Sequence, residues 1–188
     1  ANQFLIKSTM ADLRNLSTDE IGSLKGSNPV FQGVELLGYY EKGDIPSPIH
    51  YYISDTNDED DGGSIIDLVS IKLRHTFGDK ATSIKYFGVS NNTDALFNTH
   101  QINNCLKACN NVYIDADLSI FVDEFKSYNT VQEFSSDTIG NVINIGSNTT
   151  LKIYGSIIFN NHLSSFYRII DSNAKTNISI SGIGGIIK

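Results

Sequence analysis

The stretch 143-INIGSNTTLKIYGSIIFNN-161 decides the fold, because two β-branched runs flank a polar turn and no acidic residue occurs in it. Alternating Ile and Leu positions are typical of strands that bury one face. Asn, Ser and Gly favour the turn between them. We therefore expect the apolar residues to fill a core and the Asn and Thr residues to close turns, so that this stretch serves as scaffold.

A second segment, 178-ISISGIGGII-187, resembles 151-LKIYGSII-158 and indicates a repeat. Matching Leu151 to Ile178 also matches Gly155 to Gly182, an offset of 27 residues. A period in the twenties made of strands and polar turns is what a β-solenoid requires, because each coil buries its apolar side against its neighbours. A meander of hairpins is the alternative, since it would produce a similar pattern.

Charge divides the chain into two regimes, because 20 of its 21 acidic residues lie before Ile139. The net charge of -7 argues against a nucleic-acid partner, which would require clustered Lys and Arg. The N-terminal residues 1–10 lack the apolar run of a signal peptide, and no later segment approaches the length of a membrane span. We expect neither a nucleic-acid nor a membrane partner.

The sequence of the first half of the chain predicts a small sheet with short helices. Ser17 and Glu20 form a capping box, which predicts a short helix that Gly26 can end. Strands are expected in 34-VELLGYYEKGD-44 and 46-PSPIHYYISDT-56, and alternation resumes over 64-SIIDLVSIKLRHTF-77.

One longer helix is expected from Asp94 to Cys109, with Asn92 or Thr93 as its N-cap. Its apolar stripe comprises Ala95, Ile102, Cys105, Leu106 and Cys109. The two cysteines share one helical face at a spacing of four, which disfavours a disulfide between them, so we expect both thiols in the core.

The order of several motifs resembles a known family, the phage tailspike and capsular polysaccharide depolymerase proteins with a pectate-lyase-like right-handed parallel β-helix. The motifs are LLGYYEKGD (36–44), DDGGSII (60–66), YFGV (86–89), NNTDAL (91–96), VYI (112–114) and SNTTLKIYG (147–155). The chain departs from the family pattern at Ser90 and Asn91, where glycine and lysine are usual, at 115–117 and in having no Trp.

The resemblance implies a mainly-β protein with a virion-side α/β module at 1–82, followed by a capping helix and the first coils of a parallel β-helix at 83–188. It also implies a homotrimeric receptor-binding protein, attached through its N-terminal part to a phage tail or baseplate protein. Such a protein is made in the cytoplasm of the bacterial host, acts on the virion or outside the cell, and recognises and degrades bacterial surface polysaccharide. We expect the repeat to continue beyond Lys188 and the depolymerase's catalytic residues to lie there.

Carboxylates before residue 125 offer the alternative of a complete small polysaccharide lyase or hydrolase. The candidates are Asp115, Asp117, Asp123 and Glu124. Neighbouring residues on a strand point to opposite faces, so Asp123 and Glu124 are not expected to converge on one glycosidic bond. Asp171 follows Arg168 by three residues, which favours a solvated surface pair over a catalytic acid.

Two clusters of potential ligand residues are candidate metal sites, but neither matches a known ligand spacing. The acidic run 54-SDTNDEDDGG-63 places Asp60 where the EF-hand template requires glycine, so a solvated loop is expected. His100 with Cys105 and Cys109 lacks further ligands at zinc-site spacing. We predict no catalytic, cofactor-binding or metal residue in this chain, and a bacterial β-solenoid adhesin is a third interpretation.

Overall fold

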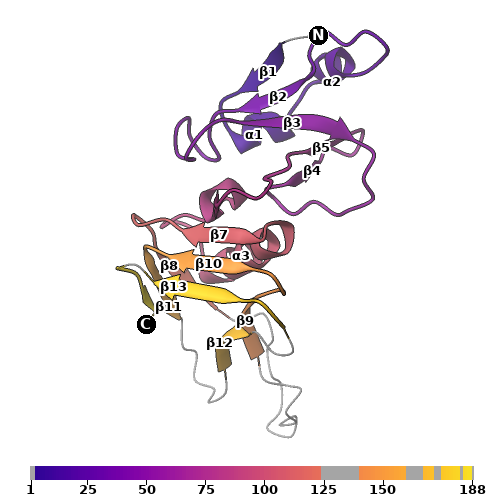
Figure 1. Ribbon diagram of the computed structural model, residues 1–188. Coiled ribbons are helices and arrows are strands. Elements are labelled where there is room, and N and C mark those ends of the chain that lie inside the picture. Colours follow the sequence, from indigo (N-terminus) through magenta and orange to yellow (C-terminus); the bar gives the residue numbers. More distant parts are fainter. Residues whose placement is uncertain (1–2, 124–139, 160–166, 172–174, 183, 188) are drawn as a thin grey trace, which may run out of the picture. The chain divides into compact units, whose positions relative to one another are not determined.

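The computed structural model describes residues 3–123, 140–159, 167–171, 175–182 and 184–187 (Figure 1). The chain forms two compact units, one from residues 1–78 with 85–88 and the other from residues 79–84 with 89–188. The boundary expected at residue 82 lies in the segment where the chain passes between the units. Over the described residues, strands far outnumber the three α-helices, which confirms the prediction of a mainly-β protein.

The first unit is a five-stranded sheet with two short helices. Its strand order is β1-β2-β3-β5-β4, with β1 and β2 parallel and the other neighbours antiparallel. The elements are β1 (Phe4–Lys7), α1 (Met10–Arg14), α2 (Thr18–Leu24), β2 (Gly33–Leu36), β3 (Ile49–Ser54), β4 (Ile65–Asp67) and β5 (Lys72–Arg74). The sequence patterns predict α2, β2 and β3, whereas β1 and α1 are too short for apolar periodicity to reveal.

The predicted capping box of α2 is confirmed. The Ser17 hydroxyl accepts the Glu20 N–H at 3.2 Å, and the Glu20 carboxylate accepts the Ser17 N–H at 2.9 Å. Glu20 also accepts a hydrogen bond from the Lys7 ammonium at 2.6 Å. The Lys7 bond and the Ser17 N–H lower the pKa of Glu20, so this cap ties the helix to β1.

The alternation expected over 64–77 is interrupted, and that part of the prediction is wrong. The structure folds this segment into β4 and β5, which pair around a tight turn at Val69 with φ 68°. The Ser70 N–H donates to the Leu68 carbonyl oxygen at 2.7 Å, and the Asp67 carboxylate accepts the Val69 N–H at 2.8 Å. Val69 is fully exposed, so its apolar side chain marks a hairpin tip and not a core position.

The second unit contains three sheets in which every described strand pair is parallel. The first has the order β13-β10-β7-β6, the second β14-β11-β8, and the third pairs β12 with β9. The strands are β6 (Thr82–Ser83), β7 (Asn111–Ile114), β8 (Ser119–Val122), β9 (Gly140–Asn144), β10 (Thr150–Ile153), β11 (Ser156–Phe159), β12 (Tyr167–Asp171), β13 (Ser179–Gly182) and β14 (Ile186–Ile187). Parallel neighbours cannot be joined by hairpins, so the alternative of a hairpin meander is wrong.

Successive passes of the chain therefore stack in layers, with β7, β8 and β9 in one and β10, β11 and β12 in the next (Figure 1). Val112 pairs with Leu151, which pairs with Ile180 in the third layer. Val112 and Leu151 are fully buried. Further buried apolar residues of these layers are Ile114, Ile120, Val122, Val142, Ile143, Ile145, Ile153 and Ile157. The expectation that the Ile and Leu residues around 143–157 form a core is confirmed.

The repeat has an offset of 29 residues over β10 and β13, so the offset of 27 is wrong. Leu151 pairs with Ile180 instead of Ile178. The turns also stack at this offset, because Asn148 and Asn177 both have a left-handed φ and the Asn177 amide donates to Asn148 Oδ1 at 3.0 Å. A strand pattern repeats every two residues, so a shift of two leaves the apolar phase unchanged and sequence matching does not detect it.

Gly155 lies where the chain turns from β10 into β11. A Cβ at this position would lie 2.2 Å from the carbonyl oxygen of Asp115 and 2.3 Å from that of Leu118. These oxygens belong to backbone, so they cannot move aside as a flexible side chain could. The neighbouring layers can approach this closely only with glycine at this corner.

We predict that Gly155→Ala destabilises the second unit by about 3 kcal/mol, because the added methyl group separates two layers. Gly146→Ala is the matched control, since its Cβ would meet the Thr149 hydroxyl at an ordinary 3.5 Å. Urea unfolding followed by circular dichroism measures both variants. Equal stability of the two variants would contradict the layered arrangement.

Candidate functional site

Helix α3 (Ala95–Ala108) lies against the edge of the first layer and forms one side of the candidate site. Its N-cap is Asp94, whose carboxylate accepts the Phe97 N–H at 2.9 Å, so the assignment of this role to Asn92 or Thr93 is wrong. Thr93 instead accepts the Ser90 N–H at 3.0 Å and bonds the side chain of Asn98. The helix thus begins one residue after its predicted start at Asp94.

The helix buries four of the five residues of its predicted apolar stripe, whereas Ala95 is half-buried. Ile102, Cys105, Leu106 and Cys109 are each at most 4% exposed. Neither cysteine forms a disulfide. The prediction of two core thiols without a disulfide between them is confirmed.

Polar side chains of the same helix bond the open backbone edge of β8. Asn98 and Thr99 are fully buried. The Asn98 amide donates to the Phe121 carbonyl oxygen at 3.0 Å. The Thr99 hydroxyl accepts the Asp123 N–H at 2.9 Å and donates to the Asp123 carbonyl oxygen at 2.8 Å. These two side chains replace the hydrogen bonds that a further parallel strand would provide.

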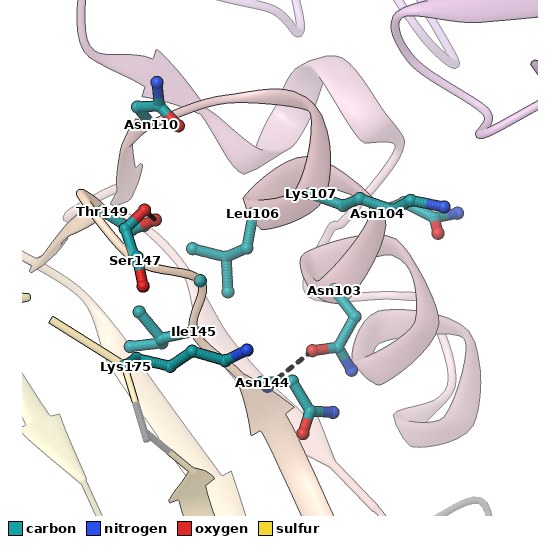
Figure 2. Close-up of a pocket in the computed structure, with 11 residues that line it drawn as sticks. Asn103, Asn104, Leu106, Lys107, Asn110, Asn144, Ile145, Ser147, Thr149 and Lys175 are labelled. Carbon is teal, nitrogen blue, oxygen red and sulfur yellow. Dashed lines mark hydrogen bonds between the residues drawn. The ribbon is translucent and has the colours of Figure 1, made fainter. Parts of the chain in front are cut away.

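Asn103 and Asn91 extend this arrangement to β9 and to the start of β8. Asn103 donates to the Val142 carbonyl oxygen at 2.8 Å. It also accepts the Asn144 N–H at 2.8 Å (Figure 2). Asn91 accepts the Ser119 N–H at 2.7 Å. Each amide provides a donor and an acceptor, as a strand neighbour would. The apolar stripe gives no sign of this polar row, which sequence analysis missed.

An open groove of about 500 Å³ lies where the C-terminal half of α3 faces the turn between β9 and β10 (Figure 2). Its lining includes four asparagines, namely Asn103, Asn104, Asn110 and Asn144. The remaining lining residues are Leu106, Lys107, Ile145, Gly146, Ser147, Thr149 and Lys175. Among the described residues, no carboxylate contributes to the lining, so this part of the groove combines amides and hydroxyls with positive charge.

The groove falls on the stretch that sequence analysis assigned to scaffold. Ile145 is 1% exposed and serves the core as predicted, whereas Asn144 and Ser147 are exposed and belong to the groove wall. Core residues and groove residues therefore alternate along the segment 143–149. A row of Asn residues near a helix end and in a facing turn is the only sequence signal that could have indicated this site.

Of the four carboxylates considered for catalysis, the structure describes Asp115, Asp117 and Asp123, which lie on either side of β8. Asp115 accepts a hydrogen bond from the Ser83 hydroxyl at 2.5 Å, and Asp123 is held through its backbone by Thr99. The Asp117 carbonyl oxygen accepts the Asn91 amide at 3.0 Å. Glu124 lies outside the described residues, and of the pair Arg168 and Asp171 the structure describes only the backbone of β12.

The acidic loop after β3 is organised by donors from the protein itself. Asp60 forms two hydrogen bonds with Arg14, at 2.7 and 2.8 Å, and accepts the Asp67 N–H at 2.8 Å. Burial alone would raise the pKa of Asp60, but the Arg14, Asp67 and Gly62 donors together lower it. Asp61 accepts the Ser64 N–H at 2.7 Å. The expected loop is confirmed, but these two carboxylates are part of a hydrogen-bonded structure instead of being merely solvated.

The metal hypotheses gain no support from the described residues. Within them, no group of three or more His, Cys, Asp or Glu side chains could hold a metal ion. His100 is exposed on α3, whereas Cys105 and Cys109 are buried. His75, in the first unit, has its pKa lowered by burial, and its ring nitrogen Nδ1 lies 2.8 Å from the His50 carbonyl oxygen.

No protein-family model matches the chain, and no curated protein matches its sequence. None of the helices in the described part of the chain has the length and apolar character needed to cross a membrane.

We predict that Thr99→Val lowers the free energy of unfolding of the second unit by about 2 kcal/mol. Valine keeps the shape but removes the hydroxyl, which is itself fully buried and bonds the N–H and C=O of half-buried Asp123. Amide hydrogen exchange should accelerate at Asp123. Thr150→Val, at a half-buried position on β10, is the control and should leave exchange at Asp123 unchanged. Unchanged exchange at Asp123 in Thr99→Val would contradict the edge-bonding role.

Proposed function

We propose that the chain is the N-terminal part of a tailspike-like receptor-binding protein, in which the second unit forms the first coils of a right-handed parallel β-helix. The observation that carries the proposal is the parallel register of Val112, Leu151 and Ile180 across three successive layers. Parallel crossovers in one sheet are right-handed in nearly all proteins, which is the basis for the proposed hand. The order of the sequence motifs supports the same family.

The side chains that bond the first layer support the role of α3 as the N-terminal cap of this β-helix. An open strand edge invites pairing with other chains, so elongated parallel folds need such a cover. Asn98, Thr99 and Asn103 satisfy backbone groups of β8 and β9. We propose that the first unit is the virion-side module, attached to a tail or baseplate protein.

A homotrimer is part of the proposal. Phe121 on β8 is 49% exposed and pairs in register with half-buried Ile158 on β11. An exposed aromatic residue beside an aliphatic one provides an apolar surface of the kind that subunit interfaces bury. We propose that copies of the chain associate through this face.

The proposed activity is recognition of bacterial surface polysaccharide, with any cleavage performed by other residues of the protein. Glycoside hydrolysis requires two carboxyl groups flanking one bond, and the Asp115 carboxylate is engaged by the Ser83 hydroxyl. A complete small lyase or hydrolase is therefore the weaker candidate. No structural observation favours an adhesin over a tailspike.

Light scattering of the full chain is expected to give the mass of three chains. In a separate assay, the protein should adsorb to encapsulated bacteria without releasing reducing ends from their capsular polysaccharide. Phe121→Ser should shift the mass toward one chain, because it removes apolar interface area. Leu96→Ser is the matched control, since Leu96 is 45% exposed on α3 and not on this face. A monomer that cleaves the polysaccharide would contradict the proposal.

A further inference from the structure

The groove beside α3 has the chemistry of a binding site for a charged, hydroxyl-rich ligand. Amide side chains donate to and accept from sugar hydroxyls, and Asn110 and Asn144 contribute to this lining from a turn and a strand end. Thr149 and Ser147 add hydroxyl groups on the opposite wall. Leu106 and Ile145, which are 4% and 1% exposed, close the floor of the groove with core side chains.

Positive charge in the groove comes from two lysines that differ in direction. Figure 2 shows the Lys175 side chain directed into the groove toward Asn103 and Asn144, whereas Lys107 runs outward along α3. Within the described part of the chain, no ion pair engages either lysine. From residue 140 onward the sequence has four Lys or Arg residues and one Asp, so the surroundings favour an anion as well.

The wall of the groove is fixed before any ligand arrives. Asn103 holds the backbone of β9 at Val142 and Asn144, and Asn148 N–H donates to the Thr176 carbonyl oxygen at 3.0 Å beside Lys175. Because these hydrogen bonds already hold the backbone of the groove wall, the wall does not have to become ordered when a ligand binds. This lowers the entropic cost of association.

We propose that this groove binds an acidic saccharide, with Lys175 bonding the sugar carboxylate and the asparagine amides bonding its hydroxyls. The inference rests on the proposed role in saccharide recognition. It adds the class of saccharide that is bound and locates the binding site in a groove formed by a single chain. A carboxylate suits Lys175 because a charge-assisted hydrogen bond is stronger than one between neutral groups.

The test titrates the full chain with tetragalacturonate, a hyaluronan tetrasaccharide and sialyllactose, using calorimetry at low salt. Methyl-esterified tetragalacturonate and lactose are the neutral counterparts. We expect at least one acidic saccharide to bind and its neutral counterpart to bind more weakly. Lys175→Gln should weaken binding about threefold to fivefold, the range of an exposed charge pair, and added salt should have the same effect.

Lys152→Gln is the matched control, because it removes the same charge from β10 outside the groove lining. It should leave the affinity unchanged, whereas Asn144→Asp should weaken binding by placing a carboxylate in the groove. The inference is overturned if no acidic saccharide binds, if the neutral counterparts bind equally well, or if Lys175→Gln and Lys152→Gln behave alike.

Adsorption to encapsulated bacteria separates this inference from the proposed function. Adsorption that Lys175→Gln leaves unchanged, with no saccharide bound in calorimetry, overturns the groove inference and leaves receptor recognition standing. Failure of the wild-type chain to adsorb contradicts the proposed function, even if the groove binds a saccharide in calorimetry.

Discussion

The second unit depends on how the open edge of its first parallel layer is satisfied. Backbone N–H and C=O groups at a buried strand edge cost free energy if they find no partner. Asn98, Thr99 and Asn103 of α3 provide those partners, through side chains that act as a further strand would. The layers that follow can then be built on a closed base, with each strand pairing in parallel to the one before it.

The hydrogen bonds between α3 and the strand edge also connect the layered core to the candidate site. Asn103 fixes β9 to the helix and thereby sets one wall of the groove, while the buried Leu106 and Ile145 form its floor. The stacked turns at Asn148 and Asn177 are joined by a hydrogen bond two residues after Lys175. The polar groups of the groove are therefore positioned by the interactions that hold the layers together. A substitution among the α3 side chains that bond the strand edge is expected to alter both the stability of the second unit and ligand binding in the groove.

Sequence patterns predicted what depends on local chemistry. The capping box at Ser17, the buried stripe of α3 and the core positions around Leu151 follow from hydrogen-bond donors and apolar periodicity that lie within a few residues of one another. The layer offset was missed because strand alternation is unchanged by a slip of two residues. The groove was missed because it joins Lys107, Asn144 and Lys175, which are distant in the sequence and meet only through parallel stacking.

The most direct test of the account is the strand register of the second unit, measured by nuclear Overhauser contacts between backbone protons in the labelled full chain. The account predicts contacts from Leu151 to both Val112 and Ile180, in the pattern of parallel neighbours. Antiparallel contacts between consecutive strands, or pairing of Leu151 with Ile178, would contradict the layered arrangement on which the cap, the groove and the proposed function all rest.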